Sequence, residues 1–152
     1  MTRRGTQSLH AESLAIAELA RAGRHEQAVQ AASTALAAPG SAAQRCRLLD
    51  LRAESLMAMG DLDRALADAQ AMRALATRSA KLRAQALCCL AGVHIRRGEI
   101  EPTLEVAQAA LEAARASRSP ALMGLAELRM GDAQHRGFTR QDLALELSLI
   151  HI

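Results

Sequence analysis

The sequence predicts an all-α protein, an α-solenoid of about four antiparallel helix pairs of which the last is incomplete. Three observations predict this class: a composition dominated by alanine, a glycine that recurs at a nearly constant interval, and apolar stripes with helical spacing around those glycines. The length of 152 residues fits a single domain.

The composition favours helix before any periodicity is considered. The chain has 35 alanines, no tryptophan, no tyrosine and one phenylalanine, Phe138. Alanine is the best helix former, and its small side chain lets helices approach closely. Strands prefer β-branched and aromatic residues, which are scarce in this chain.

A glycine recurs along the chain. Gly23, Gly60, Gly98 and Gly137 follow one another at nearly equal intervals, each interval one position longer than the last, and such a period is typical of helical repeat proteins. We expect each glycine to end one helix in a left-handed turn, directly before the next helix begins. The expected helices span residues 8–22, 25–37, 42–59, 62–76, 80–97, 100–116, 120–136 and 139–146.

The segments after the first three glycines carry the same stripe of small and apolar residues. Its positions follow the offsets i, i+3, i+4, i+7 and i+10, which lie on one face of an α-helix. The stripe contains His25, Ala28, Val29, Ala32 and Ala35, then Leu62, Ala65, Leu66, Ala69 and Met72, then Ile100, Thr103, Leu104, Ala107 and Ala110. A second stripe precedes each glycine, so a short turn between the two helices places their apolar faces together.

Capping residues support these boundaries. Ser41 and Gln44 have the spacing of a capping box, and Ser119 precedes a proline, as is typical of a helix N-terminus. We therefore expect an N-terminal tail over residues 1–7 and one repeat domain over residues 8–146. The units of that domain span residues 8–40, 41–78, 79–118 and 119–146.

Two further glycines, Gly92 and Gly131, fall in the middle of predicted helices. A glycine in a helix interior costs about 1 kcal/mol relative to alanine, so some contact should offset that cost. We expect the backbone of a neighbouring helix to approach closely at these positions. The alternative is that they leave room for a ligand.

The spacing of small residues around the first glycine resembles the tetratricopeptide repeat. The pattern Gly-x4-Ala-x6-Ala is present at Gly23, Ala28 and Ala35, with partial echoes after Gly60 and Gly98, and the resemblance covers about residues 9–146. The chain departs from that family in lacking its usual aromatic residues and in exceeding its period of roughly 34 residues. The resemblance implies a right-handed superhelix whose first helices line a concave groove.

In that family the groove holds a peptide or a neighbouring domain, and the resemblance implies groove positions in all four units. Carried over by register, these are His10, Ser13 and Arg21; Arg47, Asp50, Glu54 and Met57; Gln85, Cys88, Ile95 and Arg96; and Glu127, Gln134 and His135. Their charge is mixed. They lack the cluster of lysine, arginine and asparagine with which some members grip a terminal carboxylate.

The last six residues, 147–152, break the repeat pattern. They resemble the translated sequence of a transposon end that is used in preparing sequencing libraries. We therefore expect a non-native tail after a truncated fourth unit, with any downstream domain missing. The alternative is a short apolar capping segment.

Metal-ligating and catalytic residue types are present without a pattern that supports either chemistry. Cys88 and Cys89 are adjacent in a predicted helix and point about 100° apart, so two thiolates would not converge on one ion with His94. We expect buried thiols, no metal and no cofactor. No nucleophile motif accompanies the histidines, so the sequence predicts that the chain is not an enzyme.

Charge and hydropathy favour a soluble cytoplasmic protein. The net charge of +3 is spread along the chain without a dense basic stripe or stacking aromatics, which makes nucleic acid an unfavoured partner. The longest apolar run, residues 84–95, is shorter than the roughly 20 residues of a membrane span. Three cysteines, two of them adjacent, indicate a reducing compartment rather than a disulfide framework.

The sequence therefore predicts a protein–protein interaction scaffold. One alternative is an N-terminal regulatory or sensor module of a larger bacterial signalling protein, such as a nucleotide cyclase, a diguanylate cyclase or a transcriptional activator. A helical array that binds RNA or DNA is another alternative. An apolar face left uncovered by the fourth unit also favours self-association.

Overall fold

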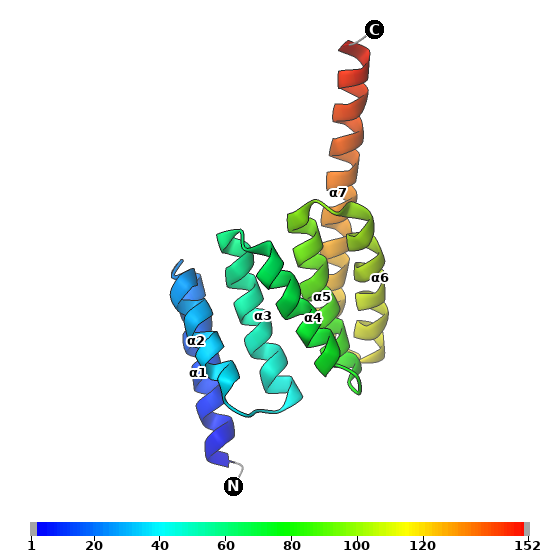
Figure 1. Cartoon of the computed structure of the whole chain (residues 1–152). Helices are drawn as coiled ribbons and strands as arrows, with labels where there is room; N and C mark the ends of the chain where they lie inside the picture. The colour runs from blue at the N-terminus through cyan, green and yellow to red at the C-terminus, as the bar shows by residue number, and fades with distance from the viewer. Residues whose placement is uncertain (1–2, 151–152) are drawn as a thin grey trace.

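The computed structural model is all-α, which confirms the predicted fold class at that level. It describes the backbone of residues 3–150 and the side chains of residues 7, 8 and 10–150; residues 1–2 and 151–152, at the ends of the two expected tails, lie outside the described residues. The described chain forms seven helices (Figure 1): α1 (Arg3–Arg21), α2 (His25–Ala37), α3 (Ala42–Met59), α4 (Leu62–Leu75), α5 (Ala80–Arg97), α6 (Ile100–Ala116) and α7 (Pro120–Ile150).

Each helix packs against the next one along the chain, so the helices follow one another in space in the order of the sequence (Figure 1). A second set of contacts joins α1 to α3, α3 to α5, and α5 to α7, whereas the even-numbered helices of the described chain do not contact one another. The odd-numbered helices therefore lie closer to one another than the even-numbered helices do.

The first three turns have the glycine conformation that the repeat suggested. Gly23, Gly60 and Gly98 have φ values of 74°, 80° and 74°, in the left-handed region that favours glycine. In each turn the amide of the residue after the glycine donates a hydrogen bond to the carbonyl five residues earlier, as Asp61 N does to Leu56 O at 2.9 Å. These bonds end one helix and reverse the chain within two residues.

The expected turn at Gly137 is wrong, and so is the separate helix over residues 139–146. Helix α7 continues without interruption to Ile150. Thr139 donates its hydroxyl to the carbonyl of His135 at 3.0 Å, and Arg140 Nη1 donates to the carbonyl of Gly98 at 3.0 Å. The first bond lies within the helix, and the second attaches the extended helix to the turn between α5 and α6.

A shift of one residue in the repeat explains why the chain does not turn at Gly137. Ala86 and Val93, buried on α5, correspond to Ala126 and Ala133, buried on α7, because the same interval separates Ser79 and Ser119, which cap the two helices. The interval between these equivalent positions is one residue longer than the interval from Gly98 to Gly137. The equivalent of the third turn glycine is therefore Phe138, whose Cβ makes the left-handed conformation costly.

The N-terminal boundary also differs from the expectation. Helix α1 begins at Arg3, so most of the predicted tail over residues 1–7 is helical. At the other boundaries the capping box of Ser41 and Gln44 is confirmed: the amide of Gln44 donates to the Ser41 hydroxyl at 3.2 Å, and the Ser41 amide donates to the Gln44 side chain at 2.8 Å. Ser119 caps α7 through the amide of Leu122 at 3.4 Å.

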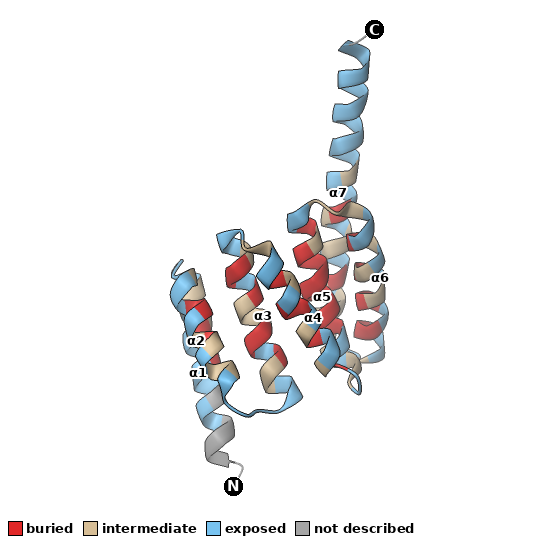
Figure 2. Ribbon diagram, in the orientation of Figure 1, coloured by how far each residue is buried: buried red, intermediate tan, exposed pale blue. Residues whose placement is uncertain are grey.

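The core lies between the helices and consists mainly of alanine and leucine. Figure 2 shows the buried positions on the facing sides of α3, α4, α5 and α6, while the C-terminal part of α7 is exposed. Ala28, Ala65 and Ala107 of the predicted stripe are completely buried, and Ala35 is half-buried. Alanine at these positions brings the helices close, and larger residues such as Leu56 and Met72 fill the remaining space.

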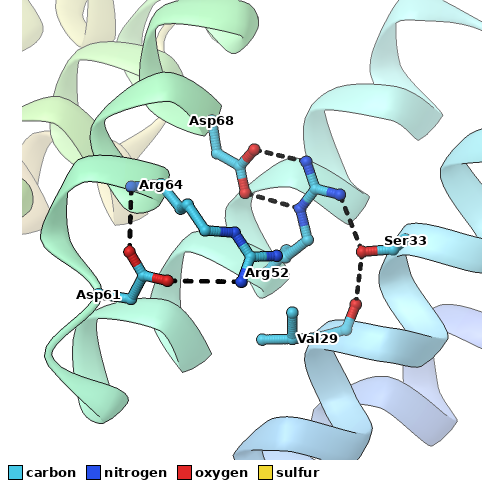
Figure 3. Close-up of polar contacts among 6 residues, drawn as sticks. All are labelled: Val29, Ser33, Arg52, Asp61, Arg64 and Asp68. Atoms are coloured by element: carbon cyan, nitrogen blue, oxygen red, sulfur yellow. Dashed lines mark hydrogen bonds and ion pairs between the residues drawn. The ribbon is translucent and has the colours of Figure 1, made fainter.

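A buried ion pair that no sequence pattern indicated joins α3 to α4. Arg52 donates from Nε and Nη2 to the two carboxylate oxygens of Asp68 at 2.8 and 2.6 Å (Figure 3). Its Nη1 donates to the Ser33 hydroxyl at 3.0 Å, and that hydroxyl donates to the carbonyl of Val29 at 2.8 Å. The guanidinium therefore connects three consecutive helices.

Candidate binding groove

Helices α3, α5 and α7 form a surface groove of about 910 Å³. Helices α3 and α7 both pack against α5 and, among the described residues, not against each other. Helix α5 therefore forms the floor, and the other two helices form the walls. The groove follows from the spacing of the odd-numbered helices rather than from a loop or an insertion.

Six of the predicted groove residues line this hollow: Arg47, Asp50, Glu54 and Met57 on α3, and Gln85 and Cys88 on α5. Sequence reasoning missed every lining residue on α7 and several on the other two helices. They include Leu122, Leu125 and Arg129, together with Lys81 and Leu82 at the start of α5. The groove is thus a mixture of apolar and charged side chains, as expected.

The other predicted positions lie elsewhere. His10 and Arg21 are exposed on α1, Ser13 is buried there, and none of the three lines the groove. Ile95 is buried in the core, and Arg96 faces a separate hollow near the turn at Gly60. The first unit therefore contributes nothing to the groove formed by the later units.

Glu127, Gln134 and His135 are exposed on α7 and also lie outside this groove. At the interval from Gly98 to Gly137 they correspond to Cys88, Ile95 and Arg96, of which only Cys88 lines the groove. Leu128, which the corrected register relates to Cys88, is exposed outside the groove as well, so the shift alone does not explain these placements. The corrected register, in which Ala86 corresponds to Ala126, relates Leu82 to Leu122, and both line the groove.

A polar cluster lies in the middle of the groove. Gln85 Nε2 donates to Asp50 Oδ2 at 3.1 Å, which joins the floor to the wall formed by α3. Burial raises the pKa of Asp50 above its ordinary value, while hydrogen bonds from Gln85 and Cys89 and the charge of Arg129 offset part of that rise. The carboxyl group is thus already engaged within the protein.

The two thiols at the floor are poor nucleophiles. Burial raises the pKa of Cys88 to about 11, and it raises the pKa of Cys89 well above its ordinary value. Because the thiolate is the reactive form of cysteine, both side chains are unreactive near neutral pH. Their role in the groove is packing.

Arg129 reaches across the groove floor and lies against Gly92. A Cβ at Gly92 would come within 3.2 Å of Nη2 and 3.3 Å of Cζ of this arginine. The mid-helix glycine therefore makes room for a side chain, and the expected close approach of a helix backbone is not what fills the space. Arg129 Nε is buried and has no hydrogen-bond partner among the described residues.

The described part of the chain shows neither a metal centre nor a membrane span. Within residues 3–150, no three side chains of His, Cys, Asp or Glu gather closely enough to hold a metal ion. No helix in the same range combines the length and hydrophobicity that crossing a membrane requires. The chain matches no protein-family model, no curated protein and no solved structure. The fold and the groove define the class at this level: an all-helical protein with an open surface groove.

Proposed function

We propose that this chain is a binding protein whose groove between α3, α5 and α7 holds an extended segment of another protein. The observation that carries the proposal is the groove itself, a hollow of about 910 Å³ that three helices line with both apolar and charged side chains. We further propose that the stacked helix pairs form a solenoid of the tetratricopeptide type.

The two kinds of side chain in the groove suit an extended peptide. Met57, Leu82, Leu122 and Leu125 are half-buried and offer apolar surface that a ligand side chain would cover. Burial of such surface contributes about 25 cal/mol per Å². Arg47, Glu54 and Lys81 are exposed at the rim, where charged groups set orientation and partner choice more than affinity.

A binding role is favoured over a catalytic one by the chemistry of the groove. Its two thiols remain protonated near neutral pH because they are buried, and its central carboxyl group is hydrogen-bonded to Gln85. A catalytic nucleophile requires an activating base, and no histidine lines this groove among the described residues.

The test is a selection of peptides from a random display library on the wild-type chain, followed by binding measurements on blocked variants. Ala121 is exposed and lines the groove, so Ala121→Trp should fill part of the hollow without disturbing the core. Ala74, exposed on α4 away from the groove, provides the matched control Ala74→Trp.

We expect the selected peptides to bind Ala121→Trp at least roughly tenfold more weakly, and to bind Ala74→Trp as they bind wild type. Circular dichroism of both variants checks that the helices are intact. Equal binding to the two variants would place the ligand elsewhere and remove the proposed function of the groove.

A further inference from the structure

We infer that the ligand of this groove carries an internal aspartate or glutamate whose carboxylate pairs with Arg129. This inference rests on the proposed binding function and names the chemistry of the partner: an extended peptide with an acidic residue flanked by apolar ones.

The first step is that the guanidinium of Arg129 has no ion pair of its own in the described part of the protein, although Asp50 attracts it at longer range. Arg52 pairs with Asp68, and Arg97 pairs with both Asp63 and Glu99. Arg129 makes no ion pair and no hydrogen bond with any of the described residues, although it lines the groove. A cationic group held partly out of water without a partner is unfavourable, and a carboxylate that approaches it gains a charge-assisted hydrogen bond.

The second step concerns the nearby acidic group of Asp50. Its carboxylate attracts Arg129 electrostatically, but it accepts its hydrogen bond from Gln85 at 3.1 Å rather than from the arginine. Burial also raises the pKa of Asp50. The Arg129 guanidinium therefore makes no hydrogen bond to this carboxylate.

The third step is that Gly92 admits the guanidinium to the groove floor. The equivalent position on α3, at the spacing that separates Gly60 from Gly98, is Glu54, which lines the groove. Position 92 therefore faces the groove as well, and with no side chain it leaves the space that Arg129 occupies. An alanine Cβ at this position would require the guanidinium to move by a few tenths of an ångström, and a bulkier side chain would require a larger movement.

The fourth step is the place of Arg129 along the groove. Its neighbours Asp50 and Gly92 lie well inside α3 and α5 rather than at their ends. An extended ligand that crosses the groove therefore presents an internal side chain to this point, not a chain terminus. Leu122 and Leu125 precede Arg129 on the same helix, so apolar ligand residues fit beside the acidic one.

The experiment repeats the selection of random peptides on three forms of the full chain: wild type, Arg129→Met and Arg136→Met. Methionine keeps much of the length of the side chain and removes the charge. Arg136 is exposed on the same helix and does not line the groove, so its variant is the matched control.

We expect the wild-type and Arg136→Met selections to be enriched in Asp or Glu at one position between apolar residues, and the Arg129→Met selection to lose that enrichment. For a selected peptide, replacing the acidic residue by its amide should weaken binding to wild type by roughly tenfold and leave binding to Arg129→Met unchanged. Gly92→Ala, in which Arg129 is present but displaced, should show a reduced preference for the acidic peptide.

The outcomes separate the inference from the proposed function. Peptides that compete for the groove without any acidic preference would overturn the inference and leave the proposed function standing. An acidic preference that survives in Arg129→Met would assign it to Arg47 or Lys81 instead and would also overturn the inference. A selection that yields no peptide blocked by Ala121→Trp would overturn both.

Discussion

Two arginines show how the same side chain acts at two places in one molecule. Arg52 makes a bidentate pair with Asp68 and a third bond to Ser33, so most of its donors are used within the core. Arg129 lies against Gly92 with none of its donors bonded to a described residue. The first arginine therefore connects three helices, while the second is the group that we propose for ligand binding.

The Arg52–Asp68 pair leads to a prediction on stability. Arg52→Met should lower the free energy of unfolding by about 3 kcal/mol, because the carboxylate of Asp68 would stay buried without its partner. Urea unfolding followed by circular dichroism measures the change. Arg73→Met, at an exposed position of α4, is the control and should stay within about 0.5 kcal/mol of wild type. A similarly small change in Arg52→Met would mean that the pair contributes little.

At the scale of the elements, the turn glycines decide where helices end. Gly60 and Gly98 terminate α3 and α5 because their positive φ values are accessible to glycine, and the following amides bond back to the helix. Gly137 lies inside α7, one position before the true equivalent of Gly98. A glycine thus ends a helix only when the packing register places it at the turn.

This contrast predicts that replacing glycine by alanine changes the free energy of unfolding in opposite directions at Gly98 and Gly137. Gly98→Ala should lower the free energy of unfolding by about 1 kcal/mol, because alanine is strained at a φ of 74°. Gly137→Ala should raise it by up to about 1 kcal/mol, because alanine favours helix and its Cβ would meet only Ile100 Cγ2, at 3.6 Å. Thermal and urea unfolding of both variants provide the test. A loss of stability in Gly137→Ala equal to that in Gly98→Ala would indicate that the chain turns at Gly137 in solution.

At the scale of the whole molecule, stability is unevenly distributed. Helix α5 packs against α3, α4, α6 and α7 and is the most completely buried element, whereas the last turns of α7, residues 141–150, extend beyond the packed helices (Figure 2). Leu143, Leu147 and Leu149 are each more than half exposed. A helix segment with few tertiary contacts is marginally stable in water.

Amide hydrogen exchange should reveal this gradient. We expect the amides of α5 to exchange on the order of 100-fold more slowly than those of residues 141–150, because the former open only when the stacked helices separate. Exchange measured by mass spectrometry on peptides from both segments resolves the difference. Equal protection of the two segments would show that the end of α7 is packed in solution.

Local sequence signals determined the helices and most of their boundaries. The abundance of alanine, the apolar stripes and the capping pair of Ser41 and Gln44 predicted an all-α chain with turns near Gly23, Gly60 and Gly98, since these effects act within a few residues of chain. The same signals, combined with the family resemblance, predicted six of the groove residues. That was possible because the register between α3 and α5 equals the spacing of their glycines.

The other features of the fold and the groove depend on how distant segments pack, so only the tertiary structure decided them. The continuation of α7 past Gly137 and the placement of Glu127, Gln134 and His135 outside the groove are seen only in the structure. The pairing of Arg52 with Asp68 joins two helices, and the contact of Arg129 with Gly92 joins two that are not consecutive in sequence. A sequence pattern reports the period and face of each helix, whereas the rotation of one helix against another is set by the side chains between them.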